Sequence, residues 1–221
     1  LYQTGLEILQ TALREATDAH LVGRDILGTD FSCTVNVVAV DMGFMGGEET
    51  VQMALIKGRR GMPEQRPPFP AQYGLWDKPT AINNVETLAN VPLIVRDGPA
   101  PFISAGSKNT GGTKIVSIYD FAEESLPMAV EVPFGATLRQ ILTQAGLNRS
   151  ESDTRAVVVG GAEGGALPLS LLDTAYDFDT IEENGAIIGS SIIELLPLDT
   201  CMVAWSMERS RYLSHESCGK C

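Results

Sequence analysis

Val35-Asn36-Val37-Val38-Ala39-Val40 is mostly apolar and β-branched, which is typical of a strand buried on both faces of an α/β sheet. Gly46-Gly47 follows and would break this strand. Residues 48–57 then have the pattern of a helix, and Gly58 is placed to end it. A strand, a glycine turn and a helix in this order predict an α/β unit.

Helices are expected on both sides of this unit. Thr4-x-x-Glu7 has the form of a capping box before a helix with an apolar stripe. Residues 59–80 are rich in proline and are expected to be irregular. Asn83 is then placed to cap a second helix. Prolines and glycines at 99–112 predict a linker, with a domain boundary near residue 112.

The second half of the chain has shorter elements. Strands are expected at 113–119, 128–132, 156–159 and 191–195. A helix is expected at 138–145, with Thr137-x-x-Gln140 as its capping box. Two strands, a helix and two further strands predict a small α+β module of the β-grasp type. From Thr200 the pattern is helical again.

Composition excludes several classes of function. The 221 residues carry 28 acidic and 16 basic side chains, a net charge of −12, which disfavours a general nucleic-acid binder. The longest apolar stretch, 186–198, is interrupted by Glu194 and Pro197, so no direct membrane insertion is expected. Four cysteines are too few for a disulfide scaffold, which indicates a reducing, cytoplasmic compartment.

The first motif with chemical potential is Gly46-Gly47-Glu48-Glu49-Thr50. A glycine turn at a helix start favours an anion, but two adjacent carboxylates would repel a phosphate. They suit ligand hydroxyls and amides, such as the ribityl, ribose or carboxamide groups of a nucleotide cofactor. The alternative is that the two carboxylates only stabilise the first turn of a helix.

The second motif is the basic and proline-rich segment 57–70. Four of the 16 basic residues lie between Lys57 and Arg66 and could receive a dinucleotide pyrophosphate. Phe69 stands between prolines and could stack on an aromatic ring. A rigid surface loop whose arginines pair with nearby carboxylates is the alternative.

Two further motifs are weak by themselves. Residues 79–87 place asparagines and threonines around a helix start, where they could bind a polar cofactor or only cap the helix. Cys218-x-x-Cys221 has a spacing that can share one metal or cluster. Half a zinc knuckle, a redox dithiol and two unligated cysteines are its alternatives.

Taken together and in this order, these motifs resemble one family. The matching segments are 47–50, 58–61, 66–70, 82–92, 131–135 and 215–221. The chain resembles the NADH-binding flavoprotein subunit of respiratory complex I (the bacterial F chain), and its relatives in NAD-linked formate dehydrogenases and hydrogenases.

The resemblance implies three domains in an α/β protein. Residues 1–112 would be the C-terminal part of an FMN- and NADH-binding α/β domain with its linker. Residues 113–197 would be a β-grasp, soluble-ligand-binding domain, and residues 198–221 the first helix of an iron–sulfur helical domain. The implied function is an NADH:acceptor oxidoreductase subunit of quinone type, in which a hydride passes from NADH to FMN and single electrons then pass to a 4Fe-4S cluster. The implied partners are a thioredoxin-like 2Fe-2S subunit and a larger iron–sulfur subunit, which could hold the chain at the inner membrane.

The resemblance also assigns roles to residues. It implies a catalytic Glu49 and two cluster ligands, Cys218 and Cys221. Arg66 and Phe69 would contact NADH together with Glu49. The residues that would line FMN are Gly47, Glu48, Glu49, Ile82, Asn83, Asn84 and Thr87.

Departures from the family pattern qualify this interpretation. The family's glycine-rich flavin loop would lie upstream of Leu1, and two more cluster cysteines would lie beyond Cys221. We therefore expect a fragment that alone is inactive and retains neither FMN nor a complete cluster. A non-catalytic docking or assembly module with a decayed flavin site is the main alternative, and a zinc-binding domain is the other.

Overall fold

The computed structural model describes residues 3–40, 43–121 and 126–220. Its contacts divide the chain into two units: residues 1–82 with Lys220 form unit 1, and residues 83–219 form unit 2. This division falls between Ile82 and Asn83, upstream of the boundary expected near residue 112. Within the described ranges, no helix is long and apolar enough to cross a membrane.

Unit 1 is built from helices and irregular segments. Its elements are α1 (Gln3–Asp18), η1 (Ile26–Gly28), η2 (Phe44–Gly47), α2 (Glu49–Ile56) and η3 (Leu75–Asp77). The capping box expected at Thr4 is wrong, because Thr4 already lies inside α1. Glu7 instead accepts a hydrogen bond from the Gln3 side-chain amide, one turn earlier, at 3.1 Å.

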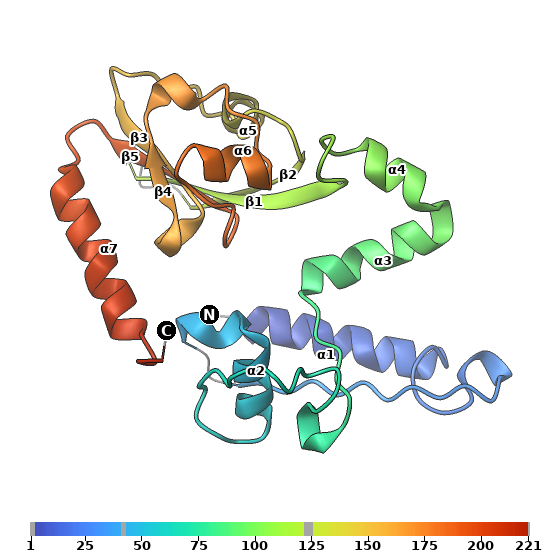
Figure 1. Cartoon of the computed structure of the whole chain (residues 1–221). Helices are drawn as coiled ribbons and strands as arrows, with labels where there is room; N and C mark the ends of the chain where they lie inside the picture. Colours follow the sequence, from blue (N-terminus) through green and yellow to red (C-terminus); the bar gives the residue numbers. More distant parts are fainter. Residues whose placement is uncertain (1–2, 41–42, 122–125, 221) are drawn as a thin grey trace. The chain divides into compact units, whose positions relative to one another are not determined.

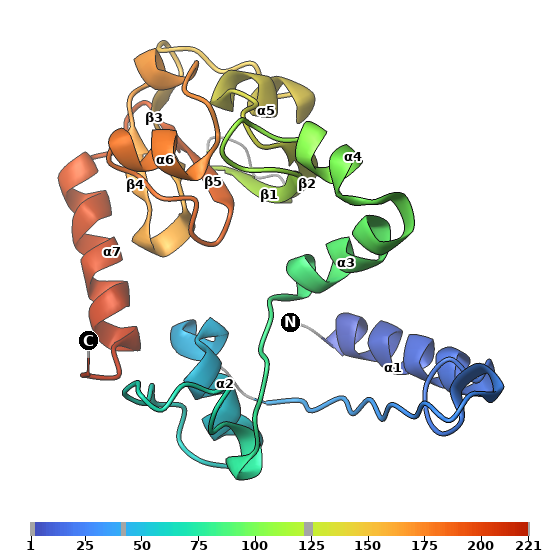
Figure 2. The ribbon, with the colours of Figure 1, turned by 45° about the vertical axis from the view of Figure 1, so that its right-hand side comes forward.

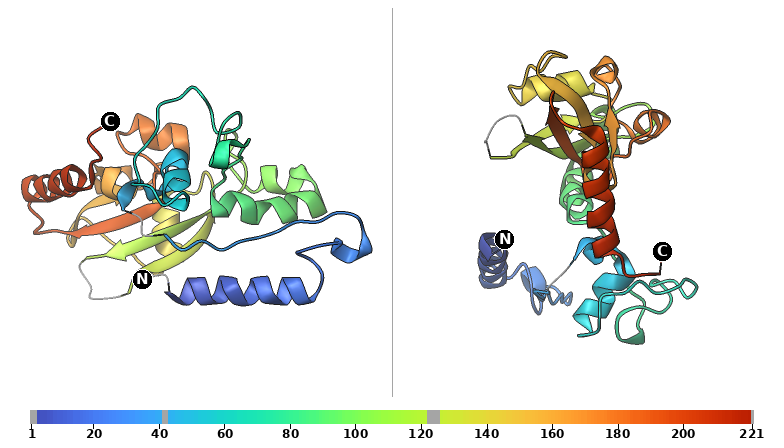
Figure 3. Two further views of the ribbon diagram at one scale, coloured as in Figure 1. Left: turned by 90° about the horizontal axis from the view of Figure 1, so that it is seen from below. Right: turned by 90° about the vertical axis from the view of Figure 1, so that its left-hand side faces the viewer.

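The strand expected at Val35–Val40 is also wrong. Residues 34–40 form no ladder and are drawn as a loop (Figures 1 and 3). A strand needs a neighbour for its backbone N–H and C=O groups, and the described part of unit 1 contains only an isolated bridge between Gly23 and Cys33. Val35 and Val38 are about half exposed, so the apolar pattern alone did not produce a buried strand.

Helix α2 follows the sequence prediction closely. The Glu48 side chain caps its N-terminus by accepting the Val51 N–H at 2.9 Å. At the other end Gly58 has φ +68°, and its N–H donates to the Leu55 carbonyl. The Arg59 N–H donates to the Ala54 carbonyl, which completes a Schellman motif. Gly58 therefore ends the helix, as expected.

Unit 2 begins with two helices, α3 (Val85–Asp97) and α4 (Pro99–Ser104). The N-cap of α3 is Asn84, whose side chain accepts the Glu86 N–H at 2.8 Å. The prediction that Asn83 caps this helix is therefore wrong by one residue. Helix α4 lies within the segment that was expected to be a linker.

One mixed five-stranded sheet forms the centre of unit 2 (Figure 1). The strands are β1 (Thr113–Asp120), β2 (Met128–Pro133), β3 (Thr154–Val159), β4 (Gly165–Leu167) and β5 (Ile192–Pro197). Their order is β2-β1-β5-β3-β4, with β1 and β5 parallel and the other neighbours antiparallel. The four expected strands are confirmed to within a few residues, whereas β4 was missed.

Helices pack against both faces of this sheet (Figure 2). The main core lies between the sheet and the helices α5 (Leu138–Gln144) and α6 (Phe178–Glu183). The α5 helix has the expected capping box between Thr137 and Gln140. On the other face, α7 (Met202–Glu216) places Trp205 against a smaller cluster around Val158. Two short 3₁₀ turns, η4 (Gly161–Glu163) and η5 (Leu169–Leu171), complete the unit.

Candidate functional site

Unit 1 brings together three of the residues predicted to bind nucleotides. Glu48 caps α2 and Glu49 is its first residue, so the two carboxylates stand at the helix start. The Arg66 guanidinium bridges them: Nη2 lies 2.9 Å from Glu48 Oε1, and Nη1 lies 2.5 Å from Glu49 Oε1. Arg66 is 40 % exposed, so the positive end of this cluster faces solvent.

Electrostatics keep Glu48 ionised. Burial acts to raise the pKa of Glu48, but hydrogen bonds from Thr50 and Val51 and the charge of Arg66 outweigh it. The pKa of this carboxyl therefore lies below its usual value. The site thus offers carboxylate oxygens as acceptors and a guanidinium as an anion partner within one short segment.

Thr50 was not singled out by the sequence. Its side chain is buried, with a relative exposure of 3 %. The hydroxyl donates to Glu48 Oε2 and accepts the Glu64 N–H at 2.9 Å. The only sequence signal was its place beside Glu48-Glu49, because nothing local indicates contact with a residue 14 positions away.

Phe69 stays on the surface of unit 1. Its side chain is 51 % exposed, and its carbonyl accepts the N–H groups of Gln72 and Tyr73 in a tight turn. Lys57 Nζ donates to the Gly74 carbonyl at 3.1 Å and so ties the same loop back to the end of α2. The ring is therefore available for stacking on a planar ligand.

The remaining predicted FMN residues lie at the unit boundary. Ile82 ends unit 1 and is half-buried, whereas Asn83, Asn84 and Thr87 belong to unit 2 and are exposed. Asn84 Oδ1 is engaged in capping α3. The grouping of Asn83, Asn84 and Thr87 with Glu48 stays a prediction.

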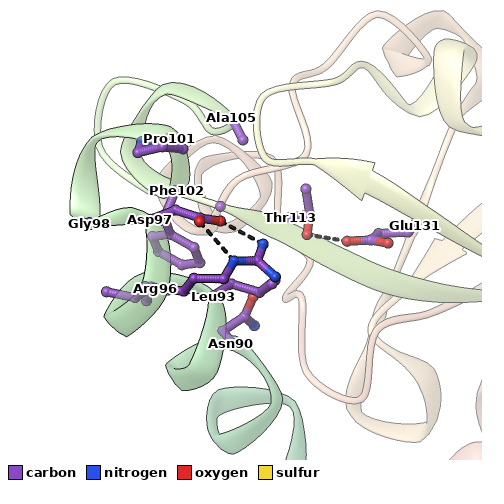
Figure 4. Close-up of a pocket in the computed structure, with 12 residues that line it drawn as sticks. Asn90, Leu93, Arg96, Asp97, Gly98, Pro101, Phe102, Ala105, Thr113 and Glu131 are labelled. Carbon is purple, nitrogen blue, oxygen red and sulfur yellow. Dashed lines mark hydrogen bonds and ion pairs between the residues drawn. The ribbon is translucent and has the colours of Figure 1, made fainter.

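The described part of unit 2 contains two pockets of note. One of about 340 Å³ lies between α3, α4 and the start of β1, and it holds the Arg96–Asp97 and Thr113–Glu131 pairs (Figure 4). It contains none of the predicted site residues. A second, of about 580 Å³, is lined in part by Asn84 and Thr87.

The second pocket also contains an unpredicted contact between α3 and β1. Glu86 Oε1 accepts the Ile115 N–H at 2.8 Å, and its other oxygen pairs with Lys114. This contact fixes the helix that carries Asn84 and Thr87 against the sheet.

The polar side chains of this cluster fit part of a flavin or nicotinamide nucleotide. Carboxylates at Glu48 and Glu49 suit hydroxyl and amide donors, and Arg66 suits a phosphate. A side chain added at Gly47 would meet nothing within 4 Å, so the backbone beside the carboxylates is open.

The described residues do not fit a four-iron cluster. Such a cluster takes four cysteine ligands, and no group of three or more His, Cys, Asp or Glu side chains that could hold a metal occurs in residues 3–40, 43–121 and 126–220. Cys218 is half-buried just after α7, and Cys221 lies outside the described residues.

Comparisons with known proteins show which proteins this chain is similar to. Residues 2–93 match the family described as the Nuo51 FMN-binding domain. This segment contains Glu48, Glu49, Arg66, Asn84 and the loop that joins them. This part of the chain is therefore similar to an FMN-binding domain, and the resemblance seen in the sequence is confirmed.

Individual relatives are similar over nearly the whole chain. The NADH-quinone oxidoreductase F chain of Rickettsia bellii is 36 % identical over 216 residues, which cover 96 % of this chain and 51 % of that protein. NADP-reducing hydrogenase subunit HndC of Solidesulfovibrio fructosivorans is 34 % identical over 221 residues, 100 % of this chain and 45 % of that protein. The chain thus spans about half the length of the curated relatives it matches.

A solved structure supports the same relationship. An NAD⁺-reducing [NiFe]-hydrogenase in the air-oxidized state matches with a TM-score of 0.79 and 27 % identity, covering 100 % of this chain and 35 % of that one. The chain is a mixed α/β protein with one mixed sheet, similar in structure to a subunit of that enzyme.

Proposed function

We propose that this chain is the part of an NADH:acceptor oxidoreductase subunit that contacts NADH and FMN. The observation that carries the proposal is the bridge from Arg66 to both Glu48 and Glu49 at the start of α2. It lies inside the segment that matches an FMN-binding domain, and the named relatives are oxidoreductase subunits.

The residues of unit 1 would bind and orient the nucleotides. The Glu49 carboxylate would accept hydrogen bonds from the carboxamide or hydroxyl groups of the ligand, and Arg66 would bind a phosphate. Phe69 would stack on the adenine. An acidic site of this kind would discourage a 2′-phosphate, which favours NADH over NADPH but does not separate the two.

The other FMN contacts would come from Gly47, Glu48, Ile82, Asn83, Asn84 and Thr87. Bound FMN would supply the chemistry of accepting a hydride and passing on single electrons, and the protein would supply position and electrostatics. These side chains would hold the two nucleotides in a fixed orientation and would transfer no electrons themselves.

The domain assignment is part of the same proposal. The strand order β2-β1-β5-β3-β4, with α5 on one face, supports a β-grasp domain at 113–197. Helix α7 and Cys218-x-x-Cys221 would begin an iron–sulfur domain, although no electron step is derived through it. Because the relatives are named as subunits, we also propose thioredoxin-like 2Fe-2S and larger iron–sulfur partner subunits and a cytoplasmic location.

Ligand-observed NMR on the purified chain tests the nucleotide site. Saturation transfer to NADH is expected for the wild-type chain. Arg66→Gln should weaken NADH binding roughly tenfold through loss of a charge-assisted bond. Arg14→Gln is the matched control, because Arg14 is an exposed arginine of α1 in the same unit and should leave binding unchanged.

The possible results separate the proposal from its alternative. An equal loss of NADH binding in Arg66→Gln and Arg14→Gln would contradict the proposed nucleotide site. Absence of transfer to both NADH and FMN would favour a non-catalytic assembly module. We further expect the purified chain to lack the flavin absorbance band, and stoichiometric FMN after purification would contradict that expectation.

A further inference from the structure

Thr50 has an unusual position for a polar side chain in unit 1. Thr50 is 3 % exposed, yet it lies next to the half-buried carboxylates of Glu48 and Glu49. Its hydroxyl uses both its donor and its acceptor: it donates to Glu48 Oε2 and accepts the Glu64 N–H at 2.9 Å. A valine of the same shape could make neither bond.

These bonds close a ring of contacts. From Thr50 the ring passes to the Glu64 backbone, and two residues further along the chain it reaches Arg66. Arg66 Nη2 then returns to Glu48 Oε1 at 2.9 Å. The segment that carries the guanidinium is thus attached to the helix start at two points, one of them buried.

The two oxygens of Glu48 have different surroundings. Oε2 faces inward and accepts from Thr50 and from the Val51 N–H at 2.9 Å. Oε1 faces Arg66, whose side chain is 40 % exposed. An exposed ion pair of this kind contributes little to stability and can exchange partners, whereas buried hydrogen bonds are costly to leave unmade.

We propose that Thr50 is a positioning residue: its buried hydroxyl fixes the Glu48 carboxylate and the 64–66 segment together, so that Arg66 can leave the carboxylates for an anionic nucleotide while both stay in place. The ligand part of this inference rests on the proposed function. The positioning part concerns the chain without any ligand.

Two substitutions separate the hydroxyl from the shape of the side chain. Thr50→Val keeps the volume and the β-branch but removes both hydrogen bonds. Thr50→Ser removes a methyl group but keeps the hydroxyl. Thr11→Val is the matched control, because the Thr11 hydroxyl donates to the Glu7 carbonyl on exposed α1.

The first measurement needs no ligand. Carboxyl ¹³C shifts during a pH titration report the pKa of Glu48, and amide exchange reports the Glu64 N–H. In Thr50→Val the pKa of Glu48 should rise, because a bond that favours the ionised form is lost. Exchange at Glu64 should accelerate by roughly three- to tenfold, the range expected for one hydrogen bond. Thr50→Ser and Thr11→Val should match the wild type in both.

The second measurement uses ADP as an anionic nucleotide probe. Thr50→Val should bind ADP roughly tenfold more weakly than the wild type, because the Arg66 segment is no longer fixed, and Thr50→Ser should restore binding. An unchanged Glu48 pKa or an unchanged Glu64 exchange rate in folded Thr50→Val would overturn the inference, as would failure of Thr50→Ser to restore them. If the wild-type chain binds neither ADP nor NADH, the proposed function fails, and the ligand-free measurements still decide the role of Thr50.

Discussion

The guanidinium of Arg209 lies 5.3 Å from the ring centroid of Trp205, one turn earlier on α7. The same guanidinium pairs with Glu194 on β5, on the sheet face opposite the main core. The aromatic ring, the cation and the carboxylate together attach α7 to the sheet. Since Glu194 is only 5 % exposed, this attachment places an ionisable group inside the protein.

The burial of Glu194 should make the stability of the protein depend on pH. Burial raises the pKa of Glu194 above its usual 4.5, and Arg209 offsets part of the effect. In the window between the unfolded and the raised folded pKa, the folded state binds more protons, so this group's contribution to stability falls as pH rises. Glu194→Gln should remove that component. Urea unfolding from about pH 4 to about pH 7 measures it, with exposed Glu182→Gln as the control. Identical pH profiles for wild type and Glu194→Gln would contradict the prediction.

Glu86 should contribute more to the free energy of unfolding as a hydrogen-bond acceptor than as an ion-pair partner. Glu86→Ala leaves the Ile115 N–H without its side-chain partner and should cost about 1–2 kcal/mol. Glu86→Gln keeps an acceptor oxygen, and Lys114→Met removes only the ion pair, so each should cost less than about 1 kcal/mol. Unfolding free energies and amide exchange at Ile115 test this order. The prediction fails if Lys114→Met is as damaging as Glu86→Ala.

The capping box of α5 should carry measurable stability. Thr137 Oγ1 accepts the Gln140 N–H at 3.2 Å, and the Gln140 side chain accepts the Thr137 N–H at 2.9 Å. Thr137→Ala should therefore lower the unfolding free energy by about 0.5–2 kcal/mol, and Thr137→Ser should preserve it. Thr143→Ala, in the same helix, is the control because Thr143 is exposed and its hydroxyl donates to the Arg139 carbonyl one turn earlier. A larger loss at Thr143 than at Thr137 would refute this account.

Gly160 should tolerate a side chain far less well than Gly146. Both have positive φ, +107° and +78°. A Cβ at Gly160 would lie 2.3 Å from the Ile187 carbonyl oxygen, whereas one at Gly146 would meet nothing within 4 Å. Gly146→Ala should cost about 1–2 kcal/mol from backbone strain alone. Gly160→Ala should cost about 1–3 kcal/mol more than Gly146→Ala, because of the clash. Equal losses of unfolding free energy for the two variants in urea would contradict this prediction.

Elements with local signals could be predicted from the sequence. Helix α5 has its capping box and α2 has Gly58 at its end, so each carried its own boundaries. Strand β4 has only three residues, two of which are Gly165 and Ala166, and it forms by pairing with β3. Val35–Val40 has the composition of a strand but no partner in the described part of unit 1. Strand pairing is a property of two segments, which one segment's composition does not contain.

The same limit applies to the candidate site. Glu48, Glu49 and Arg66 could each be named from their motifs, but their direct contact depends on the path of the proline-rich loop. Thr50 and Glu86 were missed as connectors because their partners lie 14 and 29 residues away. Individual ligand-type residues are readable from sequence, whereas the hydrogen bonds that orient them are set by the tertiary structure.

The position of β5 has a consequence for synthesis of the protein. It comes last in sequence among the five strands of the sheet, yet it lies between β1 and β3 and pairs with both. Until Pro197 has left the ribosome, the β1–β2 hairpin and the β3–β4 hairpin have no shared neighbour. The sheet can therefore close only after nearly all of unit 2 has been translated, and the edges of β1 and β3 that pair with β5 lack this partner until then.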